Sequence, residues 1–518
     1  MTASDLRPTR SPGRLSRRTV LFLLGAGASG LLAACSGAAA PSATSAPSAA
    51  APKPTEAPKP AAAATQAQPA APAAQPAATS GPAAQAKPTE AAGPAAPVAQ
   101  GQQAPAASKK LSGTLRLHMR SGSEDDTVNE LLPKFTQDTG VEVKVENIPS
   151  NEYFTKLQTM IAGSTIGDLW WCAYRNTPRF ANNKVIMPLD DIIAKDNFDL
   201  SQYYQGAIDA TKFQGMMYAL PFKYHPGASV LYYNANHVQA AGVKLPEKQF
   251  ASWDEFIMLA KPLLKESGGR VERWPFYLQI TSAATNTLQL ATMFFRSWGH
   301  DVYTEDGKKS LFGEQPARDA IRFVADLMHK HKVAAPGQEI SANVEDLMIA
   351  EKVSMLQAHS STKSITTKIG GKFEVKNMLL PPGPSGKLGS QAITDQIVIN
   401  AKTQNPDAAW ELGKFLCGKE FGVRLGGGTG GTASGTCGGR RDVFTDPRLM
   451  ANPLHPIFLS LVEQAPAIRF PANLREEEVA MAVHQTLMPI WLGERQPDDA
   501  FFTEFNGAVQ GVLDRPIA

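Results

Sequence analysis

The order of apolar and polar positions after residue 110 predicts alternating strands and helices. Thr114 to Met119 (TLRLHM) alternates as a short strand, and Asn129 to Gly140 has the apolar spacing of an amphipathic helix that ends at a glycine. VEVKVENI, YFTKLQTMIAGS and IGDLWWCAY then predict a strand, a helix and a third strand. This order builds a mainly parallel α/β sheet, and such sheets bind ligands beyond the carboxyl ends of their strands.

Later helices are predicted by their starting residues. Ser252 to Glu255 is an S-x-x-E capping box, so we expect a helix from there through Leu264 with an apolar stripe that includes Phe256. Asn405 and Pro406 similarly open another helix. Three tryptophans fall on predicted helices and are expected to pack in the core: Trp253, Trp410 and Trp491.

The apolar run in SRRTVLFLLGAGASGLLAAC (16–35) has three conflicting interpretations. It is too short and too rich in glycine for a membrane span of about 20 residues. Its G-x-G-x-x-G spacing lacks the strand, helix and acidic residue of a dinucleotide-binding turn. Arg17 and Arg18 before the run and Leu32 to Cys35 after it resemble a twin-arginine signal and a lipobox. We therefore expect a signal peptide at 1–34 and a lipid on Cys35, with the twin-arginine or general export route left open.

Removing this segment changes the charge of the chain. The full sequence has a net charge of +3, but five arginines and one aspartate give residues 1–34 a charge of +4. The remaining chain is therefore near −1, without the basic surface that nucleic-acid binding needs. From 35 to 110 the composition falls to Ala, Pro, Ser, Thr and Gln, which predicts a lipid-anchored disordered tether.

The body from 111 to 518 is too long for one core and suits two lobes. Its three cysteines match no metal-ligand spacing and cannot form a disulfide framework, although a bridge between Cys417 and Cys437 remains open. We expect no cofactor and no metal.

Five segments of the body resemble family 1 of the extracellular solute-binding proteins, the sugar-binding components of ABC importers that are similar to maltose-binding protein. They are FTQDTGVEVKVENIPSNEYFTKLQTMIAGSTIGDLWW, GMMYALPFKYHPGASVLYYNANHVQAAGVKLPEKQFASWDEFIMLAK, MIAEKVSMLQAHSS, NPDAAWELGKFLCGKEF and GGRRDVFTDPRL. Gly167 stands where the family usually has proline, and Glu351 where it prefers glycine.

The resemblance implies a two-lobe periplasmic-binding-protein type II fold with a hinge and a ligand cleft between the lobes. One lobe would comprise 111–222 and 389–435, and the other 223–388 and 436–518. Closure around a carbohydrate would be the signal to the ABC transporter permease. We expect a monomer outside the cytoplasm, held to the bacterial membrane by its lipid.

A carbohydrate site needs aromatic faces and planar hydrogen-bonding groups. The predicted site residues follow the strands, the interlobe crossing and one second-lobe helix: Arg120, Ser121, Glu124, Asp125, Trp171, Tyr174, Arg175, Lys223, Tyr224, His225, Trp298, His359 and Ser360. Strand alternation favours Trp171 over Trp170. We expect Trp171→Ala to weaken binding and leave the fold intact.

Catalytic motifs are absent from the sequence. It contains no H-E-x-x-H and no G-x-S-x-G, and RLGGGTGGTASGTCGGRR lacks the G-K-[ST] of a phosphate-binding loop. We therefore expect a binding protein and no enzyme. Two alternatives remain: a cell-surface hydrolase or transferase that acts on glycans, and a receptor for an anionic solute such as glycerol-phosphate.

Overall fold

The structure is a computed structural model that describes residues 111–122, 124–280, 283–337, 344–360, 365–427, 436–466 and 468–518. The predicted signal peptide (1–34) and tether (35–110) lie outside these residues, as do positions 428–435 of the glycine-rich run. Across the described ranges, no helix is both long enough and apolar enough to span a membrane.

The first sheet contains five strands in the order β2-β1-β3-β12-β6. Their bounds are β1 Thr114–Arg120, β2 Glu142–Ile148, β3 Leu169–Ala173, β6 Leu220–His225 and β12 Ile393–Ile399. β1 pairs in parallel with β2 and β3, whereas β12 runs antiparallel to both β3 and β6. The three predicted strands and their parallel order are therefore confirmed.

The first two predicted helices are also present, with one boundary shifted. α1 spans Asp125–Thr139 and begins four residues before the predicted start at Asn129. Asp125 and Asp126 lie in its first turn, where carboxylates favour the positive end of the helix dipole. Gly140 ends α1 with a φ of 80°, and its N–H donates to the Thr136 carbonyl at 2.8 Å.

Short helices and a two-stranded hairpin complete the region around the first sheet. They are α2 Tyr153–Ala162, α3 Thr177–Asn182, α4 Asp190–Asp196, α5 Gln205–Asp209, α12 Pro406–Leu416 and α13 Lys419–Leu425, with the hairpin β4 Lys212–Phe213 and β5 Met216–Met217. Trp410 of α12 is buried in this core, as predicted, and its Nε1 donates to Asp196 Oδ2 at 2.9 Å.

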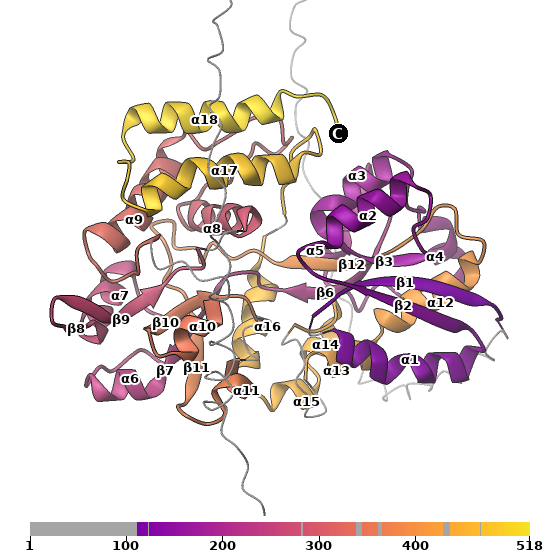
Figure 1. Cartoon of the computed structure of the whole chain (residues 1–518), viewed down its shortest axis with the longest axis horizontal. Helices are drawn as coiled ribbons and strands as arrows, with labels where there is room; N and C mark the ends of the chain where they lie inside the picture. The colour runs from indigo at the N-terminus through magenta and orange to yellow at the C-terminus, as the bar shows by residue number, and fades with distance from the viewer. Residues whose placement is uncertain are drawn as a thin grey trace, which may run out of the picture. The chain divides into compact units, whose positions relative to one another are not determined.

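The second sheet has the order β11-β7-β10-β9-β8. Its strands are β7 Val230–Asn234, β8 Lys265–Ser267, β9 Arg270–Tyr277, β10 Val353–Ala358 and β11 Val375–Leu379. Its accompanying helices are α6 Ala235–Ala240, α7 Trp253–Ala260, α8 Ala284–Ser297, α9 Gln315–His329, α10 Val344–Ile349, α11 Ile365–Ile369, α17 Glu476–Trp491 and α18 Asp499–Leu513. Three further helices are α14 Arg441–Phe444, which packs against α13, α15 Pro447–Met450, and α16 His455–Gln464, which contacts β6 of the first sheet and β11 of the second. Figure 1 shows α17 between α8 and α18, with which it packs.

The capping box forms at the start of α7, with one different partner. Ser252 Oγ accepts from the Glu255 N–H at 3.2 Å, but Glu255 Oε2 accepts from the Ala251 N–H at 2.6 Å. The α-helix ends at Ala260, earlier than predicted, and a 3₁₀ turn follows at Lys261–Leu263. Pro262 has no N–H to continue the helical ladder, which accounts for this change.

Trp253 and Trp491 are both buried in the core beside the second sheet, as predicted. The chain passes from the first sheet to the second between β6, which ends at His225, and β7, which begins at Val230. It returns to the first sheet at β12. The lobe boundaries near 222 and 388 stay a prediction.

Candidate functional site

Three predicted residues lie near the carboxyl ends of strands in the first sheet: Arg120 on β1, Trp171 on β3 and Lys223 on β6. β3 and β6 both run antiparallel to β12, so they point the same way as β1. Their carboxyl ends therefore share one edge of the sheet, which is where α/β folds bind ligands.

Lys223 is at the centre of a buried ion-pair cluster. Its Nζ contacts Glu124 Oε1 and lies 2.8 Å from Asp395 Oδ2, and all three residues are buried. Burial alone would raise the pKa of Asp395, but Lys223 holds it down at about 2. Burial by itself would lower the pKa of Lys223, but Asp395 and Glu124 outweigh it and raise the pKa above its usual value. The cluster therefore holds one cation between two carboxylates.

Asp395 is a member of this cluster that the sequence interpretation missed. It occupies the third position of β12, whose sequence ITDQIVI is otherwise rich in apolar residues. A carboxylate in a buried strand is rare unless it is paired. An aspartate within this apolar stretch could therefore have indicated a buried ion pair. The partner comes from β6, far away in the sequence, and only the folded chain shows the pair.

Arg120 and Trp171 extend the cluster with an aromatic face. The Arg120 guanidinium carbon lies 4.5 Å from the Trp171 ring centroid, and Arg120 Nη2 lies 3.5 Å from Glu124 Oε1. Trp171 is 3% exposed and packs edge-on against Tyr153. Within the described ranges, Trp171 Nε1 has no hydrogen-bond partner. Trp170 instead packs against Phe180, as strand alternation requires.

Two histidines, one beside each sheet, lie close to one another. His225 ends β6 of the first sheet, His359 follows β10 of the second, and their ring centroids are 5.8 Å apart. Burial lowers the pKa of His225 to about 3 and that of His359 to about 4. Both rings are therefore neutral at pH 7, and each has one donor and one acceptor nitrogen.

Ser360 lies beside these histidines, and its carbonyl accepts from Tyr232 Oη at 3.3 Å. Its side chain is buried. Ser360 Oγ and His225 Nδ1 have no hydrogen-bond partner in the part of the chain that the structure describes. Buried polar atoms are normally paired, so these two atoms have unused hydrogen-bonding capacity in the cluster.

Tyr174 and Arg175 lie at the edge of a neighbouring pocket. They form a 3₁₀ turn after β3, where the Tyr174 ring is 5.7 Å from that of Phe470. Arg175 Nε donates to Glu477 Oε1 of α17 at 2.5 Å. Further lining residues of this pocket come from α8, the segment between α16 and α17, α17 itself and the return to β12: Thr292, Arg296, Arg469, Glu476 and Gln391. The pocket is thus bounded by residues associated with both sheets.

Glu476, at the start of α17, is a buried acid in this pocket that the sequence analysis did not include in the site. Tyr303 Oη donates to its Oε2 at 2.9 Å. Burial raises its pKa to about 7, although that hydrogen bond and the nearby Arg175 oppose the shift. Glu476 is therefore only partly charged at neutral pH.

Two predicted residues are packed away from the cluster. Tyr224 stacks on Tyr204 with ring centroids 5.3 Å apart, because alternation along β6 places it on the opposite face from Lys223. Trp298 ends α8 and packs against Phe323 at 5.0 Å, beside the core of the second sheet.

Ser121 follows β1 and Asp125 begins α1, and both make local hydrogen bonds. The Ser121 carbonyl accepts from Ser150 Oγ at 2.7 Å, and Asp125 Oδ2 accepts from the Gly122 N–H at 3.4 Å. Burial raises the pKa of Asp125. These two residues are therefore at the border of the site.

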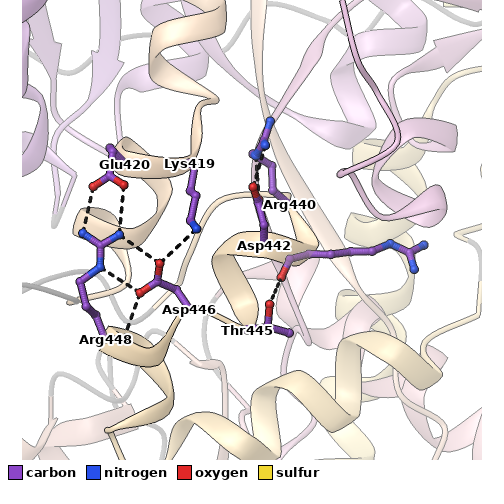
Figure 2. Close-up of polar contacts among 8 residues, drawn as sticks. Lys419, Glu420, Arg440, Asp442, Thr445, Asp446 and Arg448 are labelled. Atoms are coloured by element: carbon purple, nitrogen blue, oxygen red, sulfur yellow. Dashed lines mark hydrogen bonds and ion pairs between the residues drawn. The ribbon is translucent and has the colours of Figure 1, made fainter. Parts of the chain in front are cut away.

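A second group of charges pairs internally. Figure 2 shows Arg448 between Glu420 and Asp446, with Lys419 Nζ 3.5 Å from Asp446 Oδ2. Hydrogen bonds from Arg448 keep the pKa of Asp446 well below its usual range. The two cations neutralise the two carboxylates, so these ion pairs link α13 to α15 and the group has no net charge.

The thiols and acidic groups give no indication of a metal site. Cys417 and Cys437, for which the sequence left a disulfide open, are buried and not bridged, and Cys172 is also a buried, unbridged thiol. Among the described residues, no group of three or more His, Cys, Asp or Glu is placed to hold a metal ion.

Comparisons with known proteins all point to one family. The erythritol/L-threitol-binding protein of Mycolicibacterium smegmatis is 25% identical over 365 residues, which cover 61% of this chain and 71% of that protein. An ABC substrate-binding protein from Listeria monocytogenes, solved with cycloalternan, has a TM-score of 0.67 at 17% identity and covers 78% and 99% of the two chains.

A further solved relative is UgpB from Mycobacterium tuberculosis in complex with glycerophosphocholine. Its TM-score is 0.66 at 18% identity, and the match covers 77% of this chain and 98% of that one. Residues 121–421 match the family of bacterial extracellular solute-binding proteins. The chain therefore belongs to this family of binding proteins and has its two-lobe α/β fold.

Proposed function

We propose that this protein is a lipid-anchored receptor that captures a carbohydrate or related polyol between its lobes and delivers it to an ABC permease. The lobes would comprise 111–222 with 389–435 and 223–388 with 436–518. Family membership and the meeting of His225 with His359 from the two sheets support this proposal. A solute that touches both lobes would favour the closed form, which is the form a permease must distinguish.

The observation that carries the proposal is a set of buried polar atoms without partners in the described ranges: Trp171 Nε1, His225 Nδ1 and Ser360 Oγ. They come from both sheets and stand next to the charge-balanced cluster at Lys223. Hydroxyl groups both donate and accept hydrogen bonds, so a polyol can satisfy such atoms without adding charge. We leave Tyr224 and Trp298 out of the proposed site because their rings are packed elsewhere.

Isothermal titration of the purified protein with a panel of sugars and polyols tests the proposal. We expect saturable binding of at least one compound, and chromatography of the mixture after prolonged incubation should return that compound unchanged. Appearance of a cleaved or transferred product would support the glycan-acting enzyme instead. Failure of every sugar and polyol, neutral or charged, to bind would contradict the carbohydrate proposal.

The anchor is tested separately by replacing Cys35. We expect Cys35→Ser to move the protein from the membrane fraction to the soluble fraction and to abolish incorporation of labelled palmitate, because only the cysteine sulfur can receive the lipid. Ser36→Ala is the matched control and should stay with the membrane. Unchanged membrane association of Cys35→Ser would contradict the anchor.

A further inference from the structure

The start of α17 is joined to the first sheet by an ion pair between Arg175 and Glu477. Arg175 Nε donates to Glu477 Oε1 at 2.5 Å, and the two residues are 302 positions apart in the sequence. Arg175 belongs to the 3₁₀ turn that directly follows β3, whereas α17 packs against α8 and α18 beside the second sheet. The pair therefore connects segments that belong to different lobes in the proposed division of the chain.

Packing around this ion pair is tight. The Tyr174 ring lies 5.7 Å from that of Phe470, in the segment before α17, and Tyr174 is buried. The cavity beside Tyr174 and Arg175 has a volume of about 20 Å³, which is room for about one water molecule. A sugar or polyol therefore does not fit at this junction, and the solute would bind elsewhere.

Several acidic groups act on Arg175, and Glu477 is the one that hydrogen-bonds to it among the described residues. Burial by itself would lower the pKa of Arg175, but Glu477 outweighs it and raises the pKa, with further contributions from Tyr174 and Asp395. Glu476 also lies near, and its Oε2 accepts from Tyr303 Oη at 2.9 Å. Glu477 is therefore the carboxylate that fixes the position of the Arg175 side chain.

Arg175 is also packed against the aromatic residues of the proposed solute site. Its guanidinium carbon lies 5.3 Å from the Phe154 ring centroid, and the Phe154 ring lies 5.8 Å from that of Trp171. Among the described residues, Arg175 is the only ion-pair partner of Glu477. Any effect of the Glu477 charge on the solute site therefore passes through Arg175.

The proposed solute site is covered in the arrangement that contains this ion pair. Trp171, His225 and Ser360 are all buried. A solute held among them would leave only after the two lobes move apart, and that movement would separate Arg175 from Glu477. The ion pair therefore belongs to the covered arrangement and would oppose its opening.

We propose that Glu477 is a positioning residue outside the solute site, which slows release of the bound solute by holding Arg175 across the junction between the lobes. This inference rests on the proposed function, because it needs two lobes that separate before the solute leaves. The ion pair acts on the opening movement and not on the solute itself. Its effect should therefore be the same for every compound that binds.

Glu477→Gln tests this inference, with Glu478→Gln as a matched control. Both glutamates lie in the first turn of α17 and both are ion-paired, but Glu478 pairs with Arg475 and Arg515, which lie on its own side of the junction. Each substitution keeps the shape of the side chain and removes one negative charge from the start of the helix. Only Glu477→Gln removes the charge that holds Arg175.

The release rate of each compound that binds in the titration panel is measured by diluting the loaded protein and following tryptophan fluorescence by stopped flow. We expect Glu477→Gln to release each compound about threefold to fivefold faster than the wild type, as loss of a partly exposed ion pair allows. Glu478→Gln should release it at the wild-type rate. Added salt should accelerate release from the wild type more than from Glu477→Gln.

A double variant shows whether Glu477 acts through Arg175. In an Arg175→Gln background, Glu477→Gln should cause no further change in the release rate, because its partner is already absent. Glu477 is 47% exposed, so its substitution should leave the melting temperature close to that of the wild type.

Three results would overturn the inference while the proposed function stands. One is a Glu477→Gln protein that releases its solute at the wild-type rate. Another is a Glu478→Gln protein that releases the solute as fast as Glu477→Gln, which would indicate a general effect of charge at the helix start. The third is an equal acceleration by Glu477→Gln with and without Arg175. If no compound of the panel binds to the wild type, both proposals fail.

Discussion

Lys223→Met is expected to lower the free energy of unfolding by about 3–5 kcal/mol at pH 7, because it leaves Asp395 buried without its cation and Glu124 paired with Arg120 alone. Glu124 and Asp395 both contact the Lys223 ammonium group, and the lysine side chain is 4% exposed. Methionine fills a similar volume, so the loss reflects charge more than a cavity. Urea denaturation of the variant and the wild type measures the difference.

The effect should depend on pH in a defined direction. The pKa of Asp395 is about 2 in the folded protein and 3.8 ordinarily, so this group stabilises the wild type above pH 3.8. That contribution is lost as the pH falls towards 2. In the variant the buried carboxyl groups take up protons more readily, which relieves the unpaired charge. The difference in free energy of unfolding between the variant and the wild type should therefore become smaller at acid pH.

Lys308→Met is the control for this measurement. Lys308 is 70% exposed, and its Nζ lies 3.8 Å from Asp306 Oδ2, so we expect a change within about 0.5 kcal/mol. A Lys223→Met protein as stable as the wild type at pH 7 would contradict a buried charge cluster. A loss of stability of the same size at pH 7 and at pH 3 would also contradict it.

Trp171→Ala is expected to destabilise the protein by about 3–5 kcal/mol through the cavity it creates. The sequence interpretation expected the fold to stay intact, whereas the 3% exposure of the side chain leads us to expect a loss of stability as well. Tyr153 and Phe154 both pack against its ring. Thermal and urea denaturation measure the loss, and wild-type stability would contradict the packing.

Trp171→Phe separates binding from packing. Phenylalanine keeps an aromatic ring and should cost less stability than alanine, but it lacks the Nε1 donor. We expect this variant to bind the identified solute about tenfold more weakly, as loss of one hydrogen bond predicts. Unchanged affinity in a folded Trp171→Phe protein would remove Nε1 from the proposed site.

The local pattern predicts much of the first sheet, because strand and helix periodicity depends on near neighbours. The strands from Thr114, Glu142 and Leu169 and the helix that ends at Gly140 are all present. The start of that helix and the end of α7 were less well predicted. The Asp125 carboxylate favours an earlier helix start, and Pro262 has no N–H to continue α7. Such boundaries depend on single residues more than on periodicity.

The residues of the candidate site were only partly predictable. Arg120, Glu124, Lys223, His225 and His359 come together, since each was placed after or at the end of a strand. Asp395 was missed because its strand is buried and its partner is distant in the sequence. Tyr224 was included from the interlobe crossing and Trp298 from the end of a predicted helix, because the sequence there does not show which way an aromatic ring packs.

The family, the α/β class and the strands whose ends carry the candidate site were all predictable from the order of residues along the chain. Those properties follow from periodicity and from motifs of consecutive residues. Folding establishes which charges are paired, that Trp171 is buried, and that His225 and His359 lie side by side. Burial and charge balance depend on groups that lie far apart in the sequence and meet only when the chain folds.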